Sequence, residues 1–266
     1  MGKKIVCLLL ILPVAYIAYR AWGYYTPPML QQPYTILKQS DDTLRVAYIG
    51  DSWAFMHRDH DCRIAQTISD SIHQPVKVHS FGIGGLTSKE IYAAITEQGD
   101  FRNFMMRGYD YCFVSAGIND TYQKKSCSYY TTSMKGILSL LLANNIHPII
   151  LEIPDYDIHK AYERQTRSRK ALRRLSMLVN GCDMDCRQSH RDALRAMLTE
   201  EGLWEQTTLL EYKDWNSNFA HDQQNYFLPD GVHLNAAGYA RLDSVIAGCV
   251  LNHLAATSRN SGFRQE

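Results

Sequence analysis

Five short apolar runs, each separated from the next by stretches with helical spacing, constrain the fold of this chain most strongly. The runs cover residues 44–49, 75–81, 109–116, 147–153 and 207–212. Apolar runs bounded by turn residues are typical of strands covered on both faces, and helices between consecutive strands favour a parallel sheet. We therefore predict a three-layer α/β/α sandwich around a five-stranded, mainly parallel sheet, with right-handed crossovers.

One domain, residues 43–256, accounts for this alternation, followed by a polar tail at 257–266. Its composition, 45% hydrophobic and 21% charged, is ordinary for a globular protein. The spacing breaks at about 155–202, where two helical stretches, 158–180 and 187–201, follow each other without a strand between them. We interpret this region as a helical insertion. A polar, aromatic-containing loop is predicted after the fifth run, from 214 to 227.

The net charge argues against a nucleic-acid partner, but one stretch of the chain is locally basic. The formal net charge is +1, whereas nucleic-acid binders usually carry a strong basic excess, so we predict no nucleic-acid partner. Between Asp155 and Leu175 there are seven Lys or Arg residues against three acids. This stretch either meets an anionic glycan or lipid headgroup or is a solvated helical face. The oligomeric state is not predictable from these features.

The N-terminus has the pattern of a membrane-targeting segment. Lys3 and Lys4 precede an uncharged stretch at 5–19. We predict that residues 1–25 are an uncleaved membrane anchor or a cleaved signal peptide, and both alternatives place the rest of the chain outside the cytoplasm. Residues 26–42 contain three prolines and are predicted to be a linker that lifts the domain off the membrane.

The seven cysteines are compatible with an exported protein without proving export. Cys182 and Cys186 flank three residues and are predicted to be a disulfide or free thiols. A metal site is not predicted, because a second pair of soft ligands at metal spacing is missing. Cys112, within an apolar run, is expected to be a small core residue.

Polar clusters follow the predicted strands at the positions where open parallel sheets bind ligands. Gly50-Asp51-Ser52-Trp53 follows the first strand, and Gly82-Ile83-Gly84-Gly85 ends the second. Gly117-Ile118-Asn119-Asp120 follows the third, and Asp230-Gly231-Val232-His233 precedes the last helix. Each cluster alone is also a common turn or helix cap. Their joint occurrence at strand ends indicates an active site.

The residue types in these clusters fit nucleophilic catalysis. A serine hydroxyl needs a base to take its proton, and histidine suits that role near neutral pH. We predict Ser52 as nucleophile, His233 as base and Asp230 as the carboxylate that holds the second ring nitrogen. The amides of Ser52 and Gly85, with the side chain of Asn119, are the predicted oxyanion donors. Gly84 is an alternative to Gly85.

Across residues 46–254 the sequence resembles the SGNH/GDSL hydrolase superfamily, and the four clusters match its motif blocks. The resemblance implies a serine nucleophile at Ser52, oxyanion donors at Gly85 and Asn119, and a triad completed by Asp230 and His233. Two positions depart from the usual motifs. Trp53 replaces a leucine, and Ser80 stands where many members have asparagine.

The resemblance implies ester hydrolysis through an acyl-enzyme, without a metal or organic cofactor. We expect O-acetyl esters of cell-envelope or extracellular carbohydrate as substrates, with Trp53, Asp120 and Trp215 as candidate substrate contacts. A lipid esterase or lysophospholipase, or an O-acyltransferase using the same triad, are the enzymatic alternatives. A tethered glycan-binding module without catalysis is the alternative outside enzymes.

Overall fold

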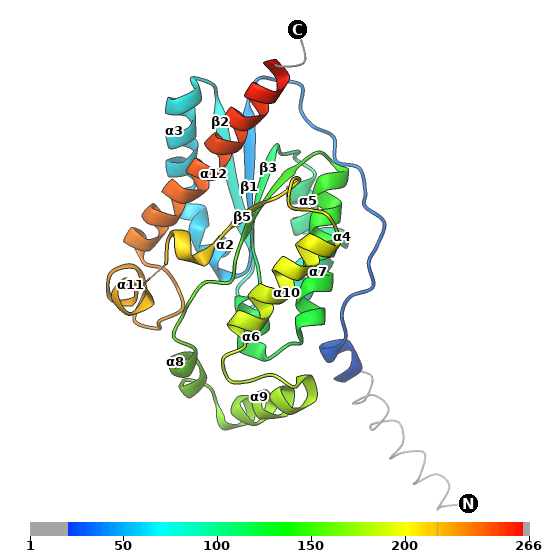
Figure 1. Ribbon diagram of the computed structural model, residues 1–266, viewed down its shortest axis with the longest axis vertical. Coiled ribbons are helices and arrows are strands. Elements are labelled where there is room, and N and C mark those ends of the chain that lie inside the picture. Colours follow the sequence, from blue (N-terminus) through cyan, green and yellow to red (C-terminus); the bar gives the residue numbers. More distant parts are fainter. Residues whose placement is uncertain (1–20, 217, 263–266) are drawn as a thin grey trace, which may run out of the picture.

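Five parallel strands form the centre of the molecule. The computed structural model describes residues 21–216 and 218–262. Its sheet has the strand order β2-β1-β3-β4-β5, and every pairing is parallel. The fold class predicted from the sequence is confirmed (Figure 1). The strands are β1 (Leu44–Gly50), β2 (Val76–Gly82), β3 (Tyr111–Ser115), β4 (His147–Leu151) and β5 (Thr208–Leu210).

Helices cover both faces of this sheet and form two separate hydrophobic cores. Alternate side chains of one strand reach opposite cores, as Ala47 and Tyr48 do in β1. The first core is built on α4 (Ser88–Thr96), α5 (Asp100–Met105), α7 (Cys127–Ala143) and α10 (Arg187–Glu200). The second is built mainly on α2 (Ser52–His57), α3 (Asp61–Ile72) and α12 (Ala236–Gly262).

The predicted helices differ from the observed ones in three places. A 3-10 turn, Arg58–His60, separates α2 from α3, although the apolar spacing from Ala54 to Ser71 predicts one helix. The first helical stretch of the insertion divides into α8 (Ile158–Glu163) and α9 (Arg167–Asn180), because Thr166 caps a new helix by accepting a hydrogen bond from the Arg169 amide. The loop predicted at 214–227 contains α11 (Phe219–Tyr226), capped by Asn218.

Residues 26–42 do not form the free spacer predicted from their prolines. They run along the domain, from the end of the sheet where the strands finish to the end where they begin (Figure 1). The amide of Gln31 donates to the Tyr92 hydroxyl at 2.7 Å, and the amide of Ile36 donates to Asn144 Oδ1 at 2.6 Å. Ile36 is buried in the first core. The segment is therefore part of the folded domain.

The predicted membrane segment lies mostly outside the described residues. Within 21–216 and 218–262, no helix combines the length and the apolar character needed to cross a bilayer. Cys182 and Cys186 are free thiols, one of the two states expected for them, and Cys112 is buried in the first core as expected.

The carboxyl ends of the four longer strands are aligned. Gly50 pairs with both Gly82 and Ser115, and Ser115 pairs with Leu151. Segments that leave these ends therefore emerge side by side. α6 (Ile118–Gln123) starts two residues after β3, so three of the four polar clusters identified in the sequence begin at one edge of the sheet.

Candidate active site

The turn after β1 places Ser52 at the first position of α2. Asp51 caps this helix, its carboxylate accepting a hydrogen bond from the Trp53 amide at 3.0 Å. The helix begins directly against β2, since a Cβ atom on Gly82 would lie 2.4 Å from both the Asp51 carbonyl oxygen and the Phe55 nitrogen. Only glycine allows this approach. The local sequence thus fixes where the Ser52 hydroxyl stands.

Ser52, His233 and Asp230 form a continuous hydrogen-bonded set. Ser52 Oγ lies 2.9 Å from His233 Nε2, and His233 Nδ1 lies 2.7 Å from Asp230 Oδ2. The other Asp230 oxygen accepts the backbone amides of Val232 and His233, each at 2.9 Å. Although burial raises the pKa of the Asp230 carboxyl, these bonds outweigh it and lower the pKa. Asp230 is therefore held as a carboxylate facing the imidazole.

Gly84, Gly85 and Asn119 line the same cavity as Ser52 and His233. Gly85 has φ +85°, a left-handed conformation that favours glycine, whereas Gly84 has no such conformation. Among the described residues, none accepts the amide proton of Gly85. That amide is available to a ligand, and the positive φ distinguishes Gly85 from Gly84 as the position where the backbone favours glycine.

The amide of Asn119 is already engaged. Its Nδ2 donates to Asp51 Oδ2 at 3.1 Å and to the carbonyl oxygen of Leu86 at 3.0 Å. Both protons are thus directed at protein acceptors, and donation to an oxyanion requires one of these bonds to be shared or released. Burial raises the pKa of Asp51 to about 7, against hydrogen bonds from Trp53 and Asn119 that lower it.

The cavity beside Ser52 has a volume of about 430 Å³. Sequence reasoning missed several of its lining residues, which come from helices α6 and α8 and from the loops beside them. Their side chains could be assigned to the cavity only once the packing of these helices was known. The lining residues not anticipated are Tyr122, Tyr156, Ala161 and Arg164.

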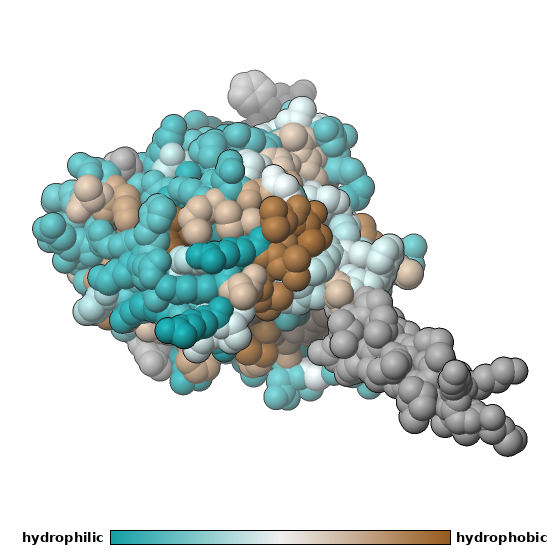
Figure 2. Space-filling view, turned by 90° about the horizontal axis from the view of Figure 1, so that it is seen from below, coloured by the Kyte–Doolittle hydropathy of each residue, from teal (hydrophilic) through white to brown (hydrophobic). Residues whose placement is uncertain are grey.

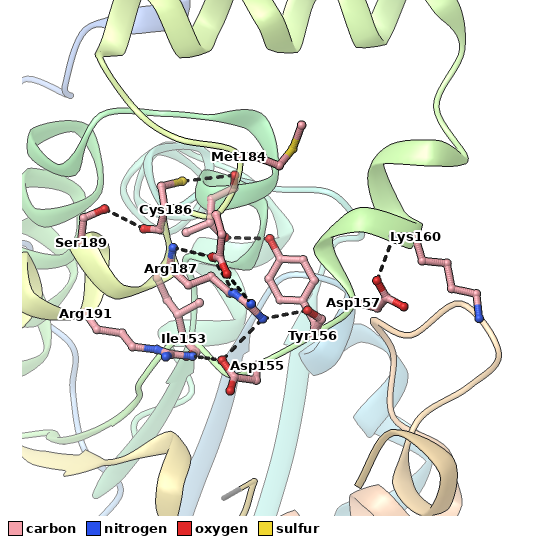
Figure 3. A network of polar contacts seen from close by, with 12 residues as sticks. Ile153, Asp155, Tyr156, Asp157, Lys160, Met184, Cys186, Arg187, Ser189 and Arg191 are labelled. Atoms are coloured by element: carbon pink, nitrogen blue, oxygen red, sulfur yellow. Dashed lines mark hydrogen bonds and ion pairs between the residues drawn. The ribbon is translucent and has the colours of Figure 1, made fainter. Parts of the chain in front are cut away.

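Tyr156 is held in the cavity wall by a polar network (Figure 3). Arg187 donates to the Tyr156 carbonyl oxygen at 2.7 Å and pairs with Asp185. Arg191 donates to the carbonyl oxygen of Ile153 and to Asp155 Oδ1, both at 2.7 Å. Two arginines of α10 therefore fix the loop that follows β4.

The three predicted substrate contacts are enclosed in the protein and do not line this cavity. Trp53 is fully buried, donates to the Val232 carbonyl oxygen at 3.1 Å and stacks edge-on with Trp215. Asp120 is also fully buried and accepts hydrogen bonds from the amide and hydroxyl of Ser88. We no longer assign these residues a contact with substrate. Trp53 instead supports the loop that carries His233.

A second serine, histidine and aspartate set lies behind the first. His57 Nδ1 is 2.8 Å from Ser80 Oγ, and His57 Nε2 is 2.6 Å from Asp243 Oδ1. Arg63 Nε donates to the other Asp243 oxygen at 2.7 Å. Ser80, the position that departs from the usual motif, therefore serves a contact between β2 and α2.

An all-parallel α/β/α fold with a serine, histidine and aspartate set at the strand ends has the architecture of an ester hydrolase. The chain belongs to the GDSL-like lipase/acylhydrolase family, whose model matches residues 48–241. It is an SGNH-type esterase, as the motif resemblance implied. No match was found among curated proteins.

Solved structures share this fold at low sequence identity. The lipase/acylhydrolase from Enterococcus faecalis superposes with a TM-score of 0.53 at 14% identity, covering 79% of this chain and 96% of that one. LAE5, an α/β hydrolase from the metagenome of Lake Arreo, gives 0.52 at 16% identity, covering 77% and 95%. The acetyl xylan esterase AlAXEase gives 0.51 at 14% identity, covering 78% and 100%.

Proposed function

We propose that this protein hydrolyses O-acetyl esters of carbohydrate through an acyl-enzyme on Ser52. The observation that carries the hydrolytic part is the Ser52, His233 and Asp230 set opening into a cavity that also contains Gly85 and Asn119. Nucleophile, base and donors for a developing negative charge thus share one space.

The steps follow from this geometry. Ser52 Oγ attacks the ester carbonyl carbon while its proton passes to His233 Nε2, and Asp230 stabilises the imidazolium that forms. The amides of Ser52 and Gly85 and the side chain of Asn119 receive the oxyanion. His233 then gives its proton to the leaving alcohol oxygen as the ester bond breaks. Water, activated by His233, releases the acid and restores Ser52.

The cavity favours a compact acyl group on a polar alcohol. Its volume of about 430 Å³ is at the small end for ligand pockets. Tyr122, Tyr156 and Arg164 supply an aromatic and cationic wall of the kind that sugars contact. The fold shared with an acetyl xylan esterase is in keeping with this substrate class.

A lipid ester is the second candidate, favoured by a specific feature. Helix α9 carries exposed leucines and follows α8 after three residues, and α8 and that connection contribute Ala161 and Arg164 to the cavity. An apolar surface so close to the site suits an aggregated or membrane-borne substrate. We also propose, from the charge pattern of residues 1–25, that the chain is exported and tethered by its N-terminus.

Substrate profiling tests the proposal. The purified protein and its Ser52→Ala variant would be given acetylated polysaccharide, short-chain and long-chain synthetic esters, and lysophospholipid. We expect acetate release from the polysaccharide by the wild type only, with short chains preferred. A preference for long chains or lysophospholipid would overturn the acetylesterase assignment. Equal fluorophosphonate labelling of wild type and Ser52→Ala would overturn the serine mechanism itself.

A further inference from the structure

Helix α9 is amphipathic in the opposite sense to the helices that cover the sheet. Its inward side is polar, with Arg173 and Ser176 buried and Asn180 turned toward the domain. Its apolar residues face solvent: Leu172, Leu175, Leu178 and Val179 are 41%, 52%, 82% and 55% exposed. Leu172, Leu175 and Val179 recur at spacings of three and four, so they share one side of the helix.

Hydrogen bonds and ring contacts hold α9 in this orientation. Arg173 donates to the Tyr24 hydroxyl at 3.1 Å, and its guanidinium lies 5.1 Å from the ring centre of Tyr122. Asn180 donates to the Lys124 carbonyl oxygen at 2.6 Å. The polar side is thus bonded to the domain, which turns the leucines outward.

Basic residues border the exposed leucines. Arg167 and Arg174 are both exposed on α9. Figure 2, which views the molecule from this end, shows a hydrophobic patch surrounded by hydrophilic surface. An apolar stripe flanked by arginines is the pattern of a helix that lies in a membrane interface, since the leucines enter the acyl region and the arginines meet anionic headgroups.

The chain also enters the described part of the fold at this helix. Tyr25, which follows the uncharged stretch at 5–19 by a few residues, lies with its hydroxyl 3.1 Å from Ser176 Oγ. Trp22, three residues before Tyr25, is 71% exposed, and tryptophan favours the membrane interface. Because residues 26–42 are bound along the domain, they leave no free spacer between this entry point and the fold.

From these observations we propose that the outer face of α9, together with Trp22, docks on the surface of an anionic lipid bilayer. The patch is defined by Leu172, Leu175, Leu178, Val179 and Trp22. This proposal goes beyond the enzymatic function and does not depend on it. It orients the protein with the carboxyl end of its sheet toward the lipid, since α9 lies at that end (Figure 1).

Fluorescence quenching by brominated phospholipid tests the contact in the full-length chain. In a Trp22→Phe background, Leu175→Trp places a fluorescent reporter on the patch. The matched control, Leu37→Trp, places the reporter at an exposed residue outside the patch; the carbonyl oxygen of Leu37 lies beside Gly108, which precedes β3. In vesicles of phosphatidylcholine and phosphatidylglycerol, we expect about half of the fluorescence added by Leu175→Trp to be quenched, and little of that added by Leu37→Trp. Absence of quenching at Leu175, or equal quenching at both sites, would overturn the proposal.

Headgroup charge is tested in the same reporter chain. Arg167→Gln with Arg174→Gln should reduce the quenching, as should salt at about 1 M or vesicles of phosphatidylcholine alone. The matched control Lys77→Gln, an exposed lysine of β2, should not reduce it. If fluorescence quenching in the arginine variant equals that in the Lys77→Gln control, the bilayer is not the partner. The same conclusion follows if light scattering shows that Leu175→Gln changes only the self-association of the protein. A Ser52→Ala chain can be used throughout, which separates this outcome from any failure of the proposed activity.

Discussion

Two sets of serine, histidine and aspartate with nearly equal spacing occur in this domain, and only one opens into the cavity beside Ser52. In the first, the histidine is 2.9 Å from Ser52 and 2.7 Å from Asp230; in the second, the corresponding distances to Ser80 and Asp243 are 2.8 Å and 2.6 Å. The side chain of His233 is 28% exposed, whereas that of His57 is fully enclosed.

The difference shows that distances alone do not define a catalytic set. His57 is surrounded by the rings of Tyr48 and Tyr239, and Asp243 is shared with Arg63. His233 instead faces a cavity that Gly85 and Asn119, the proposed oxyanion donors, also line. A nucleophile is useful only where a carbonyl carbon and its developing oxyanion fit beside it.

Replacing each of the two serines by alanine should give the largest difference in kcat between the two sets. Ser52→Ala should lower kcat for a small acetyl ester on the order of 10⁶-fold, because the described residues that line the cavity include no second serine, threonine or cysteine beside His233. Ser80→Ala should leave kcat within about twofold, since Ser80 contacts His57 and does not line the cavity beside Ser52. Steady-state kinetics and fluorophosphonate labelling measure both. A comparable loss in folded Ser80→Ala would mean that the second set takes part in the reaction.

The two aspartates should affect different properties. Asp230→Asn should lower kcat by about 10³ to 10⁴-fold, because the imidazolium loses its partner. Asp243→Asn should lower the free energy of unfolding by about 1.5–3 kcal/mol, as bonds to a charged acceptor are lost in the interior, with kcat little changed. Urea unfolding and kinetics on the same samples check this. The distinction fails if Asp243→Asn loses activity while remaining as stable as wild type.

The buried carboxyl group of Asp51, next to Ser52, should also make stability depend on pH. Burial raises the pKa of Asp51 in the folded protein to about 7. The protonated carboxyl group therefore stabilises the folded protein. This stabilisation is fully present below the unfolded pKa of about 4 and is lost as pH rises through 7, and the free energy of unfolding falls by at most about 1.4 kcal/mol per pH unit. In Asp51→Asn this loss should disappear.

Denaturant unfolding at several pH values between 4 and 8 measures that slope. Asp230→Asn is the control of opposite sign, because the pKa of Asp230 is lowered and its contribution is lost as pH falls. If the stability of Asp51→Asn keeps the wild-type slope above pH 4, Asp51 is already ionised in the folded protein and the pKa assignment is wrong.

Much of the sheet and its catalytic edge was predictable because strand signals are local. β1, β2 and β3 are short apolar runs that end in glycine or serine, and their parallel pairing brings Ser52, Gly85 and Asn119 to one edge. His233 was predictable from its spacing to Asp230. These inferences need only the chain order and the direction of the strands.

Other features depend on packing that the sequence does not encode locally. Trp53 and Trp215 were predicted to touch substrate, but their rings pack against each other below the loop that carries His233. Tyr156 reaches the cavity on a loop that Arg187 and Arg191 of α10 help to fix. The prolines of residues 26–42 suggested a spacer, yet hydrogen bonds to Tyr92 and Asn144 bind that segment to the domain.

Only residues 164–166 join the helix that lines the cavity, α8, to the helix proposed to meet the bilayer, α9. This connection is short, because the Cα atoms of Glu163 and Arg167 are four residues apart and cannot separate by more than about 14 Å. If α9 docks on the bilayer, α8 and the cavity that it helps to line are therefore held near the headgroups. The quantity that governs turnover of a membrane-borne ester is then its mole fraction in the bilayer, so that diluting the substrate with inert lipid slows the reaction even when its bulk concentration is constant.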